Sequence, residues 1–385
     1  MEDRSSGSLP RNLNLGLTRN SVDPAPMPMV ALLGRRDQPT DAVEDYCRYL
    51  GEALERLGVA LLLVRMPWLE TGWPRSLYWL WHKSKGWKGH WVMVQYTALG
   101  WSRHGVPPLF LVVLFFLRIR NTRIAVVFHD PEPYAGSRFV DKVRRICQRW
   151  MMRCTYWLAD NTILTIPVKD VSWLRPVSEK ATFIPVGANI SPVVTPILAR
   201  NGGAVKTIVV FGITGGGRVG NEVLDIAFAA RAAAKQVPGI RLVTLGRGSA
   251  ESESKFRLAL EGSAVEYNAL GILSAEEVCR VLCNSDVSLF VRGPISTQRG
   301  SAIASIACAL PLIAYANTEL AAPLCEAGLV PVPCGDREGL AEATVKVLTD
   351  RKLWLELHQR SRIPYEKYFS WEAVASRFVE LFNHA

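Results

Sequence analysis

The stretch Asp286-Val-Ser-Leu-Phe-Val-Arg292, followed by Gly293-Pro-Ile-Ser-Thr-Gln-Arg299, decides the fold class of this chain. Its first segment is typical of a buried strand, and its second segment is a polar loop. Residues 300–309 then predict a helix, and residues 311–315 predict a second buried strand. This order is how parallel α/β sheets bind anions, because the first amides and the dipole of the helix favour negative charge. The two arginines that close the quoted segments suit a diphosphate, although the pattern alone identifies no particular anion.

Apolar runs of strand length alternate with helical segments on both sides of this unit. Strands are predicted at residues 29–33, 59–64, 91–96, 124–128, 162–166, 182–185, 207–211, 242–245, 265–268, 287–291, 312–314 and 331–333. Helices are predicted between them, the clearest at residues 41–57, 108–117 and 137–158. Such alternation predicts an α/β protein with doubly wound, Rossmann-like parallel sheets.

The length of 385 residues favours two domains. A linker rich in proline and glycine, residues 193–205, is predicted to separate a first domain, 28–192, from a second, 206–368. Residues 1–27 are polar and are predicted to form a disordered leader. The closing helix, 369–385, has one apolar stripe and is expected to pack back on the first domain.

The net positive charge of the chain lies in its first half. Residues 1–200 carry 26 Lys and Arg against 16 Asp and Glu, whereas residues 201–385 carry 19 of each. Such asymmetry indicates that the first half faces an anionic partner, which could be a membrane, a nucleic acid or a phosphorylated substrate. No nucleic-acid reader motif is present, so nucleic acid is the least favoured of the three.

The compartment is predicted from cysteines and apolar runs. The eight cysteines show no CxxC and no Cys/His ligand spacing, so no metal site is expected; Cys279 and Cys283 are expected to fill core space. The chain shows no signal segment, which favours a reduced, cytoplasmic protein. Apolar runs also fall short of the roughly 18–20 residues that span a bilayer.

Two features of the first half favour peripheral contact with a membrane at its cytoplasmic face. Seven tryptophans lie between residues 68 and 101, interleaved with lysines. In the predicted helix 137–158, one face carries apolar residues and another carries basic ones. The apolar face is Phe139, Val143, Ile146, Cys147 and Trp150, and the basic face is Arg138, Lys142, Arg145, Arg149 and Arg153. Tryptophan with basic residues suits anionic headgroups, although core aromatics beside a solvated face would give the same pattern.

Several segments, taken in order, resemble GT-B glycosyltransferases of the large retaining family 4, also called glycosyl transferases group 1. In the second half these are Val209-Val-Phe-Gly212 with Arg218, Leu242–Gly248, Leu270–Val278, Arg299–Ala314 and the tail Phe369–Ala375. In the first half they are Thr40–Tyr46, with Ala42 where glycine is usual, and Phe128-His129-Asp130. The likeness covers about residues 29–385; each motif is loose, but their order is fairly specific.

The resemblance implies a GT-B fold and transfer of a sugar from a UDP- or GDP-linked donor, with retention and without an obligatory metal or other cofactor. The implied acceptor is a cell-surface polysaccharide or a lipid-linked glycan. Catalytic roles fall on His129, Arg218 and Arg299. Donor binding falls on Arg247, Leu270, Gly271, Arg292, Ser296, Thr297, Gln298, Gly300 and Ser301, and acceptor binding on Asp41 and Asp130.

Chemistry supports these roles. Arg218 and Arg299 would stabilise the charge of a departing diphosphate where no Asp-x-Asp metal motif is present. His129 ends a buried strand, and strand ends face the ligand; it could hydrogen-bond the transferred sugar or polarise the acceptor. Asp41 has a sufficient structural role as the N-cap of the first helix, so acceptor binding is its second interpretation.

Besides Ala42, one departure from the family concerns the donor loop. The paired glutamates of the family would fall on Ser296 and Ala304, and neither is acidic. Residues 296–301 resemble a polar, Arg-Gly-Ser variant of the loop, in which Ser296 or Gln298 could contact the sugar. The departure leaves open a non-catalytic GT-B module that binds nucleotide-sugar or scaffolds an assembly.

A third hypothesis is an NADP-linked oxidoreductase. Residues 215–220 match G-x-G-x-x-G between a predicted strand and a helix. The match begins four residues beyond Phe211, too late for a tight first turn. The next strand runs into Gly246-Arg247 rather than an acidic residue, so an NAD ribose is disfavoured, although an arginine would suit NADP.

Overall fold

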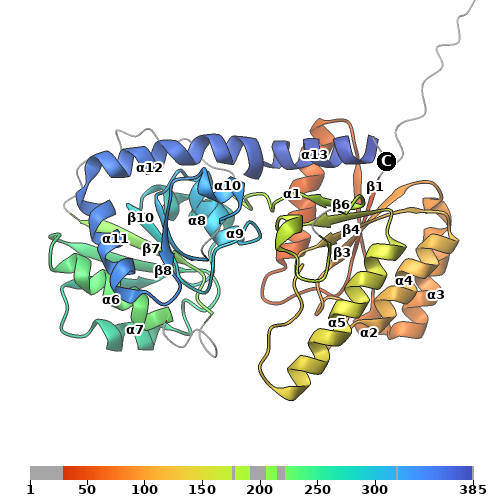
Figure 1. The fold of residues 1–385 in the computed structure, drawn as a ribbon, viewed down its shortest axis with the longest axis horizontal. Helices are drawn as coiled ribbons and strands as arrows, with labels where there is room; N and C mark the ends of the chain where they lie inside the picture. Colours follow the sequence, from red (N-terminus) through yellow and green to blue (C-terminus); the bar gives the residue numbers. More distant parts are fainter. Residues whose placement is uncertain (1–28, 176–177, 191–204, 215–221, 318–319, 384–385) are drawn as a thin grey trace, which may run out of the picture.

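The computed structural model describes residues 29–175, 178–190, 205–214, 222–317 and 320–383 (Figure 1). The predicted leader 1–27 lies outside the described residues, as does nearly all of the predicted linker 193–205. Arg218 and the glycine-rich segment 215–220 also lie outside them.

The first sheet is parallel, with strand order β2-β1-β3-β4-β5-β6. Its strands are β1 (Met29–Leu33), β2 (Leu61–Arg65), β3 (Trp91–Tyr96), β4 (Arg123–Phe128), β5 (Asn161–Leu164) and β6 (Ala181–Phe183). Its helices are α1 (Ala42–Arg56), α2 (Trp68–Thr71), α3 (Trp73–Lys83), α4 (Pro108–Ile119) and α5 (Phe139–Leu158). Strand β1 is buried along its whole length, as expected of a parallel strand covered on both faces.

The second sheet is also parallel, with strand order β12-β11-β10-β7-β8-β9. Its strands are β7 (Lys206–Phe211), β8 (Ile240–Leu245), β9 (Val265–Ala269), β10 (Val287–Phe290), β11 (Leu312–Ala316) and β12 (Leu329–Pro333). Its helices are α6 (Glu222–Ala234), α7 (Glu253–Leu260), α8 (Ala275–Cys283), α9 (Gly300–Ala307), α10 (Ala322–Cys325), α11 (Arg337–Thr349) and α12 (Arg351–Pro364). Figure 1 shows each sheet flanked by its own helices.

The predicted fold class, two doubly wound α/β domains, is confirmed. Each predicted strand is present within a few residues of its expected bounds. Helices α2 and α3 were not predicted, because proline and clustered aromatic residues obscure the helical period of the tryptophan-rich stretch. The order of each sheet reverses between β1 and β3 and between β7 and β10, and ligands bind at the carboxyl ends of such strand pairs.

The C-terminal helices connect the two domains. Helix α12 runs along the second domain, and α13 (Trp371–Asn383) continues over the first (Figure 1). The Trp371 ring stacks on Tyr49 of α1 at 5.8 Å, and its Nε1 donates to the Ala188 carbonyl over 2.6 Å. The ring centroid of Phe382 lies 4.5 Å from that of Trp91 at the start of β3. The last helix therefore holds the first domain through aromatic packing.

The seven tryptophans between residues 68 and 101 all lie in the described part of the chain, and none is exposed. Trp68, Trp87 and Trp101 are buried with the core that joins α3 and α4 to the sheet. The Arg120 guanidinium covers Trp81 at 3.5 Å. Trp68, Trp87 and Trp101 therefore fill the core, and the other four indoles are half-buried. Membrane contact through this stretch stays a prediction. Within the described ranges, no helix combines the length and the apolar character needed to cross a bilayer.

Candidate functional site

Arg292 lies at the switch point of the second sheet, directly after the buried end of β10. Gly212 follows β7, the neighbouring strand, with φ at +82°. A Cβ atom at Gly212 would come 2.9 Å from Nη1 of Arg292. The glycine therefore gives the guanidinium room to cross the end of β7. Arg292 Nη2 donates to Ser301 Oγ over 2.8 Å, which ties the strand end to the first turn of α9.

The N-terminus of α9 leaves polar groups without partners. Arg299 is the N-cap residue, and no side chain caps the helix. Around Gly300 nothing lies within 4 Å of an added Cβ, so the space before the helix is open. Arg292 Nε, Arg299 Nε and Ser296 Oγ are buried and have no hydrogen-bond partner in the described residues. A buried unsatisfied polar group costs about 1–3 kcal/mol, so three in one loop indicate a site for an anion.

Charges around this loop favour an anion too. Burial lowers the pKa of Arg292, the neighbouring Arg299 lowers it further, and Glu222 opposes both. Sequence reasoning missed Glu222, the first residue of α6, which is buried and accepts hydrogen bonds from the Thr214 amide (3.0 Å) and hydroxyl (2.5 Å). An acidic residue opening the helix after β7 was the available signal.

Thr297 and Gln298 carry the same loop to the first domain. Thr297 Oγ1 donates to the Thr165 carbonyl over 2.6 Å, and its own carbonyl accepts from the Val186 amide at 3.2 Å. Thr165 Oγ1 lies 3.4 Å from Gln298 Oε1. Thr297 is fully buried. Its hydroxyl is thus used between domains, whereas Ser296 Oγ has no such partner.

Leu270 and Gly271, which the resemblance places near the nucleotide base, follow β9. The Leu270 amide donates to the Thr244 carbonyl over 2.8 Å, while its side chain is exposed. Gly271 has φ at +65°, and its carbonyl accepts from the Gly246 amide at 2.6 Å. These backbone bonds fix the segment beside the carboxyl end of β8 and leave the leucine side chain for a ligand.

Arg247 also lies at this edge but reaches across to the first domain. Its Nη2 pairs with Asp37 Oδ2 at 3.1 Å, and its Nε donates to Thr40 Oγ1 at 3.1 Å. The Thr40 carbonyl accepts from the same guanidinium. Arg247 thus bonds to the loop between β1 and α1.

His129 follows directly after β4 in the first domain and is held on two sides. Its Nε2 lies 2.7 Å from Gln95 Oε1, and the Tyr46 ring meets it edge-on at 4.8 Å. Burial lowers the pKa of His129 to about 4, and Asp41 opposes this, so the imidazole is neutral near pH 7. Gln95 Nε2 faces the Met93 carbonyl at 3.5 Å. The amide oxygen therefore accepts from His129 Nε2–H, and Nδ1 keeps a lone pair.

Gln95 was missed by sequence reasoning. It occupies the carboxyl end of the otherwise apolar strand Trp91-Val-Met-Val-Gln95 and is buried. A single amide in such a strand was the signal, because buried polar side chains need partners.

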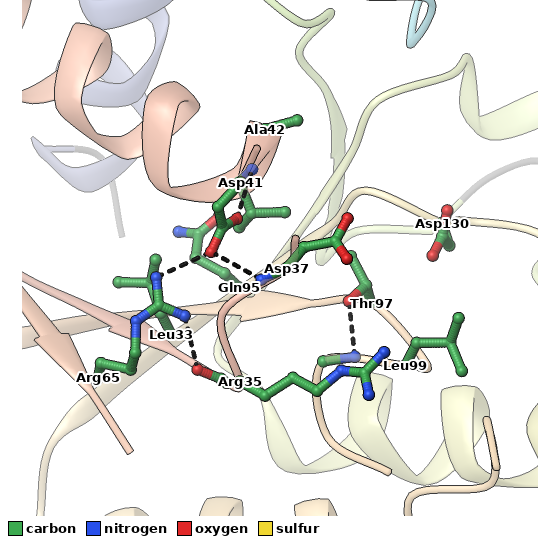
Figure 2. Close-up of a pocket in the computed structure, with 13 residues that line it drawn as sticks. Leu33, Arg35, Asp37, Asp41, Ala42, Arg65, Gln95, Thr97, Leu99 and Asp130 are labelled. Atoms are coloured by element: carbon green, nitrogen blue, oxygen red, sulfur yellow. Dashed lines mark hydrogen bonds and ion pairs between the residues drawn. The ribbon is translucent and has the colours of Figure 1, made fainter. Parts of the chain in front are cut away.

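A cavity of about 190 Å³ lies at the switch point of the first sheet (Figure 2). Asp41 caps α1 by accepting from the Val43 and Glu44 amides, each at 3.1 Å, and pairs with Arg65 at 2.9 Å. Asp130 lines the same cavity and stays exposed to solvent. Partial desolvation raises the pKa of Asp130, and Arg299 of the second domain opposes this. The cavity therefore brings both predicted acceptor residues together.

Three thiols meet away from these sites. The Sγ atoms of Cys279, Cys283 and Cys308 lie within 4.8 Å of one another and are all buried. Sequence spacing gave no sign that Cys308, at the end of α9, would join the other two. They lie in the apolar core between α8 and α9, where hydrogen bonds with the Cys279 and Cys283 thiols, and then burial, raise the pKa of Cys308.

No family model matches the chain, and no curated protein is similar to it by sequence. Solved structures are similar in fold. HepE from Anabaena, in complex with UDP and glucose, has a TM-score of 0.66 and 12% identity over 93% of this chain and 100% of its own. Sucrose-phosphate synthase from Thermosynechococcus elongatus has a TM-score of 0.66 and 20% identity over 93% and 99%. A Listeria monocytogenes protein described as a UDP-N-acetylglucosamine 2-epimerase has a TM-score of 0.61 and 13% identity over 93% and 97%.

These likenesses establish the predicted GT-B fold, with two Rossmann-like domains. The third neighbour is described by a different activity, so function has to be argued from the site.

Proposed function

We propose that this protein is a glycosyltransferase that passes a sugar from a UDP- or GDP-linked donor to an acceptor held by the first domain. The proposal rests on one observation. Arg292 Nε, Ser296 Oγ and Arg299 Nε are all buried and unpartnered in the described residues, and they belong to the segment that leads from a sheet switch point into α9. A diphosphate would satisfy the two guanidinium groups and the first helical amides together. The Anabaena neighbour was solved with UDP and glucose, which agrees with such a ligand.

The proposed reaction retains the configuration at the anomeric carbon and needs no obligatory metal. The bond from this carbon to the diphosphate breaks, a bond to the acceptor oxygen forms on the same face, and the acceptor proton passes to the departing diphosphate. Negative charge grows on the diphosphate during this step. Arg292, Arg299 and the α9 amides stabilise it, and Arg218 is expected to add a third cation.

We assign the remaining residues of the donor side the following proposed roles. Gly300 and Ser301 supply the helix end for the diphosphate, and Ser296 or Gln298 contacts the sugar. Leu270, Gly271 and Arg247 lie toward the base.

On the acceptor side, neutral His129 accepts a hydrogen bond at Nδ1 from a sugar hydroxyl, which fixes the ring orientation. Asp130 receives the acceptor, and Asp41 shapes the cavity from the start of α1. The acceptor is a lipid-linked glycan or a cell-surface polysaccharide.

A non-catalytic GT-B module is the second candidate, because Ser296 and Ala304 stand where the family has glutamates and Thr297 is used in domain docking. Hydrolysis and transfer assays across UDP- and GDP-sugars separate the two. Turnover of at least one donor, abolished by changing Arg299, supports the transferase. Stabilisation by UDP or GDP without turnover supports the scaffold. Stabilisation by NADP alone supports the oxidoreductase.

Helix α5 provides the surface for the proposed peripheral membrane contact. Phe139, Ile146 and Trp150 are 79%, 68% and 61% exposed, and Arg138, Lys142 and Arg149 beside them are exposed too. The buried side of this helix is instead Asp141, Gln148, Met151, Met152 and Thr155. An exposed apolar stripe flanked by cations suits the surface of an anionic bilayer, so the protein is expected at the cytoplasmic face of the membrane.

Sedimentation with vesicles tests this contact. Binding to phosphatidylglycerol vesicles should exceed binding to phosphatidylcholine vesicles, and Trp150→Glu should weaken it. Leu258→Glu is the matched control, because Leu258 is equally exposed but lies on α7 of the second domain. Equal binding by both variants would contradict the contact.

A further inference from the structure

A second cavity, of about 290 Å³, lies in the first domain and differs in character from the acceptor cavity. Its walls come from the start of α2, the start of α3, the loop after β3 and the start of α4. The side chains that matter here are Trp68, Leu69, Trp73, Trp101, Arg103 and Leu109. We refer to this cavity as the tryptophan groove.

The tryptophan groove and the acceptor cavity share one wall. Leu99 and Gly100 line the acceptor cavity, and the next residues, Trp101 and Ser102, line the groove. Trp68 Nε1 donates to the Gly100 carbonyl over 3.0 Å, which fixes this wall. One ligand could therefore occupy both cavities by crossing residues 99–102.

The lining chemistry favours hydrocarbon over sugar. The Trp68 and Trp101 indole N–H groups are already bonded, to the carbonyls of Gly100 (3.0 Å) and Gln95 (2.7 Å). The rings of Trp68 and Trp73 stack at 5.2 Å. Besides the Trp73 indole N–H, only Ser102 and Arg103 add polar groups among the side chains of the described residues that line the groove. A sugar ring would leave most of its hydroxyls without partners, which is costly.

The exposed side chains at the rim of the groove also favour a hydrocarbon ligand. Leu69 on the groove and Leu99 on the shared wall are 38% and 52% exposed. An alkyl or isoprenoid chain that crosses this wall would cover both leucines and gain the free energy of apolar burial. Arg103 at the groove and Arg35 at the acceptor cavity offer cations to a phosphate near the crossing.

We infer that the tryptophan groove binds the hydrocarbon chain of a phosphate-bearing lipid acceptor, whose accepting hydroxyl lies in the neighbouring cavity. This rests on the proposed function and narrows it, because the groove selects a lipid-linked acceptor over a polysaccharide.

The test uses the full chain and n-alkyl phosphates of four, eight and ten carbons, each below its critical micelle concentration. Calorimetry should show affinity rising up to about fourfold for each added methylene. Leu69→Gln and Leu109→Gln should flatten this rise, whereas Leu224→Gln, an exposed leucine of α6, should keep it. Arg103→Ala should weaken all chain lengths by a similar factor, and Arg75→Ala, an exposed arginine of α3, should not.

Affinity independent of chain length would overturn the inference, as would an unchanged rise in Leu69→Gln and Leu109→Gln. Binding of an uncharged oligosaccharide that is lost in Trp73→Leu would make the groove a glycan site and also overturn it. Thermal shift with UDP on the same samples separates the two proposals. If UDP raises the melting temperature but affinity does not depend on chain length, the groove proposal is refuted and the transferase proposal stands. If affinity depends on chain length but neither UDP nor GDP raises the melting temperature, the transferase proposal is contradicted.

Discussion

The Thr297 hydroxyl of the second domain donates a 2.6 Å hydrogen bond to the Thr165 carbonyl of the first. The same loop contributes Ser296 and Arg299, whose Oγ and Nε atoms are buried without a partner in the described residues and are assigned to the proposed diphosphate site. Domain docking and donor binding are therefore expected to depend on each other, because both need one conformation of residues 296–299.

Thr297→Val should loosen this docking. The change keeps the side-chain volume but removes a buried hydroxyl, and the loss of such a bond costs about 1–3 kcal/mol. Small-angle scattering should show a larger radius of gyration, and UDP should restore part of the compaction. Thr349→Val is the control, because the Thr349 hydroxyl bonds only within the exposed side of α11. Unchanged dimensions in Thr297→Val would mean that this bond does not hold the domains.

Arg299→Ala should weaken UDP binding by about 1.5–3 kcal/mol, as expected for the loss of a charge-assisted hydrogen bond. Calorimetry with UDP and GDP measures the loss. Arg280→Ala, on the exposed face of α8, should bind as the wild type does. Equal affinity in both variants would remove Arg299 from the site.

The neutral state of His129 predicts a pH dependence of stability. Its pKa is about 4 in the folded protein and near 6.5 in an unfolded chain. Between these values the unfolded chain takes up a proton that the folded protein does not. Stability should therefore fall as the pH falls from about 6.5 toward 4, by up to about 1.4 kcal/mol per pH unit for one proton. Denaturant unfolding at pH 7 and pH 5 should show a smaller slope in His129→Asn. His104 is exposed, so His104→Asn should leave the slope unchanged. A slope unchanged in His129→Asn would show that folding does not lower the pKa of this imidazole.

Arg247 can bind the nucleotide base only if its guanidinium first separates from the carboxylate of Asp37. Exposed ion pairs contribute about 0–1 kcal/mol, and both side chains of this pair are about half exposed, so a nucleotide can displace it. Arg247→Ala should lower UDP affinity, whereas Asp37→Asn should maintain it. Equal losses in the two variants would assign Arg247 to domain contact instead.

Much of the fold could be predicted because buried parallel strands read as short apolar runs between turn residues. Strand β4 with His129 at its end, and β10 with Arg292 after it, are examples. The cap at Asp41 was also visible from residue type and position, and the structure places it as expected.

Contacts between distant segments could not be predicted in the same way. Nothing in the spacing links Gln95 to His129, Glu222 to Arg292, or Cys308 to Cys279. Periodicity predicted the apolar stripe of α5 but could not predict which side of the helix is buried. Gln148 and Thr155 face the core, and Ile146 does not. Polar side chains satisfied by the tertiary fold can outweigh hydropathy on a single helix.

A structure of the protein with UDP bound would show whether the diphosphate binds at the start of α9. We expect the diphosphate there, within hydrogen-bond distance of the Gly300 amide and of Nε of Arg292 and Arg299. A diphosphate elsewhere, with both guanidinium Nε groups still unpartnered, would contradict it.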